Sequence, residues 1–277
     1  MSIQVAYLGP EGTYAEEAAC ALARLEKMED PQFVPCVGLH SVIEHAAKKL
    51  CDAAVVPIEN SVEGGVTASL DALWSYPELF IRRALILPIQ HCLLSSGSIS
   101  EISEVLSHPQ ALAQCSGWLN KNLPNALQLP TNSTAEAVKM VRNSKFRAAI
   151  ASNCPNNLID LKQLAYPIND VAGNRTRFVL LQREELTQRG DVASLAFSLR
   201  ANAPGALLKA LSFIANLGLN MSRIESRPSK RELGEYIFFV DLDITNAKNG
   251  AHIKLIEELK PLCEHLVHFG AYPSTSL

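Results

Sequence analysis

The chain has 277 residues, of which 48% are hydrophobic and 19% are charged, and its formal net charge is −3. This length predicts about two domains with well-buried cores, and the composition is that of a globular protein, not of a disordered one. Neither half of the chain is basic enough to favour a nucleic acid as partner. The N-terminal residues show no secretory-signal pattern, and no apolar run is long and uninterrupted enough to span a membrane.

Cysteine and histidine spacing also excludes several kinds of site. The seven cysteines are scattered and never spaced as C-x-x-C, which favours reduced thiols in a cytoplasmic protein. His265 and His268 are three residues apart, so on a strand they would face opposite sides. The sequence has no HExxH, no calcium-loop pattern, no GxGxxG and no Walker loop. We therefore expect neither a metal nor any other cofactor.

Residues 1–182 alternate apolar strands with helices, which is typical of parallel sheets covered by helices. The sequences SVIE at 41–44 and STAE at 133–136 have the pattern of a capping box, which marks a helix start. This part of the chain is long enough for two lobes with a cleft between them. In chain order, the expected elements are a strand at 3–8, a helix at 14–28, a strand at 33–37, a helix at 41–50, a strand at 53–58, a helix at 67–76, an extended run at 83–94, helices at 102–106, 109–119 and 134–141, and strands at 147–152 and 178–182.

Residues 183–193 interrupt this alternation with charged residues and a glycine, and we interpret them as a linker. After the linker we expect a strand at 194–200, a helix at 205–217, strands at 219–225 and 236–244, a helix at 251–263 and a strand at 266–272. This βαββαβ order predicts a ferredoxin-like domain. The sequence therefore predicts an α/β protein with a first domain at 3–182 and a second domain at 194–272.

The last strand of the first domain begins with an unusual polar sequence, NRTRF at 174–178. Because side chains alternate along a strand, Asn174, Thr176 and Phe178 are expected on one face, and Arg175 and Arg177 on the other. One interpretation is ordinary β propensity with solvated arginines. A glycosylation acceptor at Asn174 would require a secreted protein. The alternative is a functional hydroxyl presented to a cleft.

Three loops of the first domain end in hydroxyl side chains at or near helix starts. They are GPEGT at 9–13, PIENS at 57–61 followed by GGVT at 64–67, and PTNST at 130–134. Each loop alone is consistent with a simple N-cap. However, loops at the carboxyl ends of strands in open α/β sheets meet at one crevice, and helix N-termini attract anions. The pattern therefore predicts a site for a small organic acid between two lobes.

Four motifs, in this order, resemble those of the prephenate dehydratase family: YLGPEGTY at 7–14, PIENSVEGGV at 57–66, HPQALAQC at 108–115 and NRTRF at 174–178. This chain departs from the family at Tyr14 and Ala15, where the family often has Phe followed by Ser or Thr. The second domain resembles an ACT regulatory domain, with GALLKAL at 205–211 and ESRP at 225–228. The resemblance implies a two-lobed, periplasmic-binding-protein-like catalytic region followed by a ferredoxin-like ACT domain.

The resemblance also implies an activity, the decarboxylating dehydration of prephenate to phenylpyruvate. Thr176 would be the catalytic hydroxyl. It would act as a positioned hydrogen-bond donor, because threonine is too weak an acid to titrate near pH 7. Arg177 would either anchor a substrate carboxylate or brace its strand. The implied substrate-binding residues are Thr13, Asn60, Ser61, Thr134, Arg177 and Phe178.

L-Phenylalanine is the implied effector, with the sign of the response left open. Its two binding segments would come from different subunits of a homodimer or homotetramer. Two alternative functions stay open: an arogenate dehydratase, and a non-catalytic sensor of an organic acid. The implied effector-binding residues are Asn202, Pro204, Gly205, Ala206, Leu207, Glu225, Ser226, Arg227 and Pro228.

Overall fold

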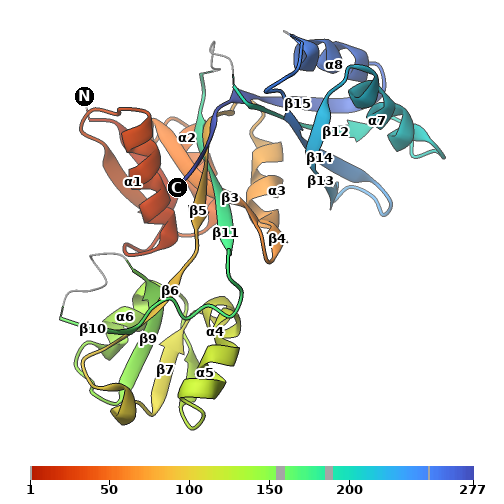
Figure 1. Cartoon of the computed structure of the whole chain (residues 1–277). Helices are drawn as coiled ribbons and strands as arrows, with labels where there is room; N and C mark the ends of the chain where they lie inside the picture. The colour runs from red at the N-terminus through yellow and green to blue at the C-terminus, as the bar shows by residue number, and fades with distance from the viewer. Residues whose placement is uncertain (1, 154–159, 185–189, 249) are drawn as a thin grey trace.

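The computed structural model describes residues 2–153, 160–184, 190–248 and 250–277. It contains three sheets, each packed against helices. Figure 1 shows them as three bodies: two lobes joined by a narrow waist, and a C-terminal domain beside the first lobe. Across the described ranges, no helix combines the length and hydropathy that a membrane span requires.

The first lobe is built on one sheet that separates two hydrophobic cores. Its elements are β1 (Gln4–Leu8), α1 (Tyr14–Leu25), β2 (Gln32–Cys36), α2 (Leu39–Ala47), β3 (Ala53–Asn60), β4 (Gly64–Gly65), α3 (Thr67–Ser75), β5 (Phe80–Pro88), β11 (Arg175–Gln182) and β16 (Ser274–Ser276). The strand order is β16-β5-β11-β3-β1-β2, with β4 paired to β3. Residues of β3 alternate between the two cores, because Ala53 and Val55 pack on the α1 side, whereas Ala54 and Val56 pack on the side of α2 and α3.

The second lobe contains a five-stranded sheet. Its elements are β6 (His91–Ser95), η1 (Ile99–Glu101), β7 (Glu104–Ser107), α4 (Pro109–Gln114), α5 (Ser116–Asn122), β8 (Leu127–Pro130), α6 (Thr134–Val141), β9 (Arg147–Ser152) and β10 (Lys162–Ala165), with strand order β10-β6-β9-β7-β8. The chain enters this lobe between β5 and β6 and leaves it between β10 and β11 (Figure 1). Two chain crossings between two α/β lobes are the arrangement of periplasmic-binding-protein-like folds, which confirms the expected fold class.

The C-terminal domain has the βαββαβ order that its sequence predicts. Its elements are β12 (Val192–Leu199), α7 (Ala206–Asn216), β13 (Asn220–Pro228), β14 (Tyr236–Asp243), α8 (Ala251–Leu259) and β15 (Cys263–Tyr272), with the antiparallel strand order β13-β14-β12-β15. One face of this sheet packs on α7 and α8, and Phe197 and Leu255 lie in that core. The other face packs on the first lobe, where Phe239 and Phe269 share a core with Leu73 of α3.

Two local expectations for the first domain were wrong, and the extended run at 83–94 was right but incomplete. Residues 102–106 are not a helix, because most of them belong to β7, and a short buried apolar run does not distinguish a strand from a helix. The extended run at 83–94 is divided between β5 and β6, which belong to different sheets. The helix expected from Ser41 begins at Leu39, with Gly38 as its N-cap, so SVIE at 41–44 is not a capping box.

The second expected capping box is half formed. Ser133 Oγ accepts a hydrogen bond from Glu136 N at 3.0 Å, but the Glu136 carboxylate accepts from Asn132 N, at 2.8 Å, and not from Ser133 N. The strands β4, β8, β10 and β16 were not expected. The domain limits 3–182 and 194–272 remain predictions, and residues 185–189 of the expected linker lie outside the described residues.

Candidate functional site

A cavity of about 600 Å³ lies between the two lobes. Its wall contains the starts of α1, α3, α4 and α6, the end of β3 and the start of β11. A volume of this size suits a small organic ligand. The loops that the sequence places at strand ends and helix starts therefore meet at one cavity, as the sheet topology requires.

The start of β11 presents Thr176 to this cavity. Asn174, Thr176 and Phe178 are 3%, 8% and 3% exposed and share one face, whereas Arg175 is exposed on the other face. Asn60, at the end of β3, donates from Nδ2 to Asn174 Oδ1 and to Thr176 Oγ1, both at 2.9 Å. A hydroxyl that accepts one hydrogen bond keeps its own proton to donate, so Thr176 can act as a donor toward the cavity.

The orientation of the Asn60 amide follows from its other contacts. Asn60 Oδ1 accepts from the backbone N–H groups of Val62 at 2.9 Å and Glu63 at 3.1 Å. These two donors require an oxygen at that position, so the nitrogen must face Thr176. The turn after β3 thereby determines that Thr176 is an acceptor from Asn60 and a donor elsewhere.

The second lobe contributes Gln114 of α4, which reaches across the cleft. Gln114 Oε1 accepts from Asn174 Nδ2 at 3.1 Å, and Gln114 Nε2 donates to Glu63 Oε1 at 3.1 Å. His91 Nε2 lies 3.0 Å from Gln114 Oε1, and His91 Nδ1 lies 3.2 Å from the Tyr14 hydroxyl. Gln114 therefore connects the two lobes beside the residues that hold Thr176.

His91 and Tyr14 are both neutral groups in this wall. Burial lowers the pKa of His91 and raises the pKa of Tyr14. The Tyr14 hydroxyl has one proton, and the nearer acceptor for it is Gln90 O at 2.7 Å. The sequence reasoning missed His91, Tyr14 and Gln114 as site residues, although HPQALAQC at 108–115 contains Gln114 and could have indicated it.

The helix starts at the wall of the cavity are suited to an anionic ligand. Among the described residues that line it, none is Lys or Arg, and Glu63 is the one carboxylate. The helices α1, α3 and α6 all begin at the wall, and the first turns of α1 and α3 have no side-chain cap. Their unpaired N–H groups and dipoles can receive carboxylates without a full positive charge. Within the described residues, no three His, Cys, Asp or Glu are grouped to hold a metal ion.

The structure brings most of the predicted substrate-binding residues together. Thr13, Asn60, Thr134 and Phe178 line the cavity with Thr176. The cavity wall includes neither Ser61 nor Arg177.

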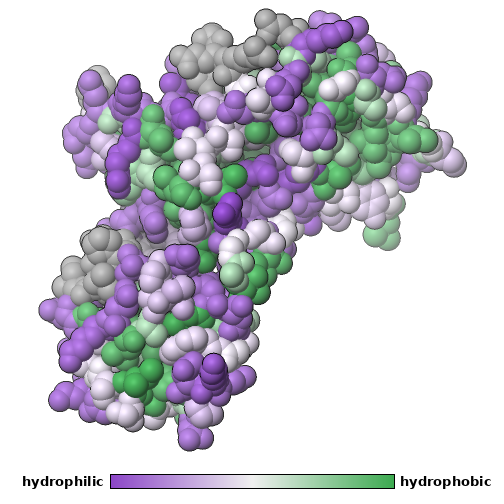
Figure 2. All heavy atoms as spheres, in the orientation of Figure 1, coloured by the Kyte–Doolittle hydropathy of each residue, from purple (hydrophilic) through white to green (hydrophobic). Residues whose placement is uncertain are grey.

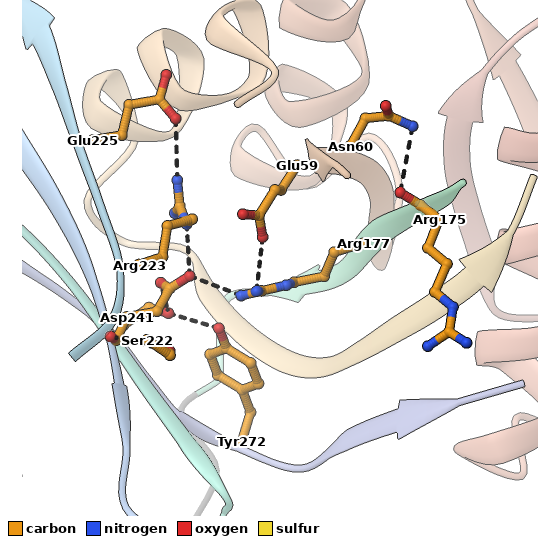
Figure 3. A network of polar contacts seen from close by, with 10 residues as sticks. Glu59, Asn60, Arg175, Arg177, Ser222, Arg223, Glu225, Asp241 and Tyr272 are labelled. Atoms are coloured by element: carbon orange, nitrogen blue, oxygen red, sulfur yellow. Dashed lines mark hydrogen bonds and ion pairs between the residues drawn. The ribbon is translucent and has the colours of Figure 1, made fainter. Parts of the chain in front are cut away.

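Ser61 and Arg177 have other partners. Ser61 Oγ accepts from Arg175 N at 2.9 Å. Arg177 extends from the opposite face of β11 to Glu59 at 2.7 Å and to Asp241 of the C-terminal domain at 2.8 Å (Figure 3). Of the two roles left open for Arg177, these contacts supply the bracing of its strand.

The predicted effector residues lie on two segments of the C-terminal domain. Gly205 is the N-cap of α7 and has a φ of 82°, which glycine adopts most readily. Asn202 Nδ2 donates at 3.1 Å to Gly234 O, in the loop that follows β13. On β13, Arg227 faces the first lobe and pairs with Asp71 of α3 at 3.0 Å.

The remaining residues of the second effector segment alternate along β13. Ser226 and Pro228 are exposed on the face opposite Arg227. Glu225 lies on the same face as Arg227, so close to the first lobe that a Cβ added at Gly65 would stand 1.7 Å from Glu225 Oε2. One face of the segment thus contacts the first lobe and the other is open.

This fold and site define a two-lobed α/β domain with a cavity between its lobes, followed by a regulatory-type βαββαβ domain. The chain belongs to the prephenate dehydratase family. The family profile described as prephenate dehydratase matches residues 5–186, and the ACT domain profile matches residues 193–251.

Similar proteins of known name and structure agree with this membership. The prephenate dehydratase of Lactococcus lactis subsp. cremoris is 38% identical over 99% of both chains, and that of Methanocaldococcus jannaschii is 36% identical over 99% of both. The crystal structure of prephenate dehydratase from Arthrobacter aurescens in complex with L-Phe gives a TM-score of 0.87 at 33% identity. That comparison covers 98% of this chain and 90% of the other.

Proposed function

We propose that this protein is a prephenate dehydratase that forms phenylpyruvate and responds to L-phenylalanine. The observation that carries the proposal is the Thr176 hydroxyl, held by Asn60 at 2.9 Å and directed at a cavity between two lobes. Relatives with the same activity in their names match the chain over its whole length, and one was crystallised with L-Phe.

The reaction needs one bond to break at each end of a cyclohexadiene ring. The bond between the ring and its carboxylate breaks and releases carbon dioxide, and its electron pair enters the ring. The ring then expels the hydroxyl group at the opposite carbon as hydroxide, which takes a proton from solvent to become water, and the ring becomes aromatic. Thr176 donates a hydrogen bond to the departing oxygen, where negative charge develops.

The two carboxylates of prephenate require different surroundings, and the cavity offers them. The pyruvyl carboxylate keeps its charge, so the helix starts at Thr13 and Thr134 suit it. The ring carboxylate must lose its charge, and a lysine or arginine beside it would oppose that loss. A wall without Lys or Arg among the described residues, with the buried Phe178 beside Thr176, favours decarboxylation.

The test is turnover of purified protein with prephenate and with arogenate in separate reactions. We expect phenylpyruvate from prephenate, with the same rate after exhaustive dialysis against a chelator. A preference for arogenate would replace the substrate in this proposal, and binding of either acid without turnover would identify a sensor. Loss of activity that a divalent ion restores would show that the reaction depends on a metal.

We also propose that the protein is a cytoplasmic homo-oligomer joined through its ACT domain. Figure 2 shows hydrophobic atoms gathered at the end of this domain that points away from the lobes. Exposed apolar side chains of the domain include Leu208, Ile224 and Leu233, at 69%, 41% and 105% exposure. Light scattering after size-exclusion chromatography tests this proposal, and a monomer at micromolar concentration would contradict it.

A further inference from the structure

Five charged side chains join the ACT domain to the strand that carries Thr176 (Figure 3). Two arginines alternate with three carboxylates across the boundary between the domains. Arg177 contacts Asp241 Oδ2 at 2.8 Å, and Arg223 Nε contacts the same oxygen at 2.7 Å. We call this set the interdomain cluster, and its members are Glu59 of β3, Arg177 of β11, Arg223 and Glu225 of β13, and Asp241 of β14.

Asp241 is the central residue of the interdomain cluster, because it contacts both arginines. Its side chain is 1% exposed, and both of its oxygens are bonded. Oδ2 receives the two arginines, and Oδ1 accepts from Ser194 Oγ at 2.6 Å. Ser194 in turn lies 2.6 Å from the Tyr272 hydroxyl. A buried carboxylate with all these partners holds one geometry, because any displacement would leave charged groups unpaired.

Arg177 is the neighbour of Thr176 on β11. Its guanidinium is held at one end by Glu59 of the same sheet and at the other by Asp241 of the ACT domain. The pairing of β11 with β3 shifts register between Arg177 and Phe178. The extra residue of this bulge is Ile58 of β3, because Arg177 and Phe178 pair with Glu59 and Pro57, and the bulge re-aims the side chains of β3 beside it.

We propose that Asp241 is a positioning residue for Thr176 and that it acts through Arg177. The inference rests on the proposed role of Thr176 as the catalytic donor. A change in the position of the ACT sheet thereby affects the active site through one ion pair, Arg177–Asp241. Glu225, from the expected effector segment, lies 3.5 Å from Arg223, so a displacement of β13 reaches the same cluster.

The first experiment compares Asp241→Asn with the wild type in prephenate turnover. The substitution keeps the shape of the side chain but removes the charge that holds Arg177, so Thr176 is displaced. We expect kcat to fall about tenfold, because small misplacements of a catalytic group are costly. KM should stay within about twofold, because other elements, the helix starts, hold the carboxylates. A wild-type kcat in Asp241→Asn would overturn the inference.

Glu26→Gln is the matched control. The Glu26 side chain is also largely buried and bound by two arginines, Arg82 at 2.5 Å and Arg83 at 2.6 Å, but these three residues all lie within the first lobe. We expect kcat of Glu26→Gln to stay within about twofold of the wild type, because Thr176 is not attached to it. An equal loss of kcat in both variants would show a general effect of instability and would overturn the inference.

A double-mutant cycle tests the route through Arg177. Arg177→Lys cannot hold Glu59 and Asp241 together with a single ammonium. If Asp241 acts through Arg177, adding Asp241→Asn to Arg177→Lys causes no further loss of kcat, whereas independent roles multiply the two losses. If Asp241→Asn does not fold, Ser194→Ala takes its place, because it removes only the hydroxyl bound to Oδ1.

Hydrogen exchange of β11 gives a readout that does not depend on turnover. We expect faster exchange at residues 175–182 in Asp241→Asn and wild-type exchange in Glu26→Gln. If the wild-type protein does not turn over prephenate, the proposed function is refuted. The hydrogen-exchange comparison of Asp241→Asn with Glu26→Gln then decides the inference. Unchanged exchange in Asp241→Asn would overturn it.

Discussion

At the scale of single residues, a threonine has one proton to donate, and Thr176 Oγ1 already accepts a hydrogen bond from Asn60 Nδ2 at 2.9 Å. That bond leaves the Thr176 proton to be donated into the cavity. A weak acid can thus serve the reaction, because it stabilises the departing oxygen by position and does not have to give up its proton fully.

We predict that Thr176→Ala lowers kcat about 10²- to 10³-fold, the usual cost of one positioned donor. Thr176→Ser keeps the hydroxyl and should retain far more activity. Steady-state assays with prephenate measure both, and thermal unfolding checks that the variants fold. A near-normal kcat in Thr176→Ala would exclude the hydroxyl as the catalytic donor.

A second residue-scale prediction concerns His268 of β15, whose pKa is lowered by burial, and then by His252, to about 4. The unfolded state binds a proton near pH 6.5, while the folded state stays neutral down to about pH 4. Stability contributed by the neutral ring is therefore present above pH 6.5 and is lost as the pH falls toward 4.

At pH 5 this loss amounts to about 2 kcal/mol relative to neutral pH. Urea unfolding of the wild type and His268→Leu at pH 7.5 and pH 5 measures it. The free energy of unfolding should fall by that much more in the wild type than in the variant. Equal losses of unfolding free energy in the two proteins between pH 7.5 and pH 5 would contradict the lowered pKa of His268.

At the scale of elements, the Glu225 side chain of β13 occupies the space that a side chain at Gly65 of β4 would need. An added Cβ would stand 1.7 Å from Glu225 Oε2 and 2.4 Å from Glu225 Cδ. We predict that Gly65→Ala costs about 1 kcal/mol through overpacking. The double variant Gly65→Ala with Glu225→Ala should regain most of this loss, because the obstructing carboxylate is gone.

Denaturant unfolding of the two single variants and the double variant measures the coupling between Gly65 and Glu225. Their coupling should be favourable by about the same 1 kcal/mol. If the effects of the two substitutions on the free energy of unfolding simply add, Gly65 of β4 and Glu225 of β13 are not in close contact in solution.

Sequence patterns predicted elements best where local rules decide them. The strand expected at 147–152 is β9 with those bounds, because its apolar run is buried in the middle of a sheet. The helix expected at 102–106 is largely the strand β7, since a short run with three buried residues fits either structure. No local signal marks β16, which has the polar sequence STS and exists because β5 offers it a pairing edge.

The candidate site could be predicted in part, for the same reason. Thr176 and Phe178 follow from the alternation of one strand, and Thr13 and Thr134 follow from helix starts. Gln114 and His91 enter the site from the second lobe, and only the packing of two lobes brings them to Asn174. The contact of Arg177 with Asp241 likewise depends on how two domains dock, which residue spacing does not reveal.

At the scale of the whole molecule, the expected effector site is divided between subunits. We predict that L-phenylalanine shifts the protein toward its larger assembly, because a ligand that binds only the assembled site favours that state. Sedimentation velocity over a range of protein concentrations, with and without the ligand, measures the shift. A monomer that binds L-phenylalanine as tightly as the assembly, by calorimetry, would contradict a shared site.

The strand β16 has a mechanical consequence for the whole molecule. After β15 the chain leaves the ACT domain and pairs as β16 with β5 of the first lobe, from Ser274↔Ala84 to Ser276↔Ile86. The chain therefore connects the ACT domain to the first lobe at both ends of the domain, before β12 and after β15. Moving the ACT domain away from the first lobe would break the pairing of β16 with β5, whereas a small rotation about the line that joins the two attachments would keep it. Such a rotation displaces the residues at the domain boundary by a distance of ångström size. A rigid ion pair transmits that displacement, whereas a flexible tether would absorb it.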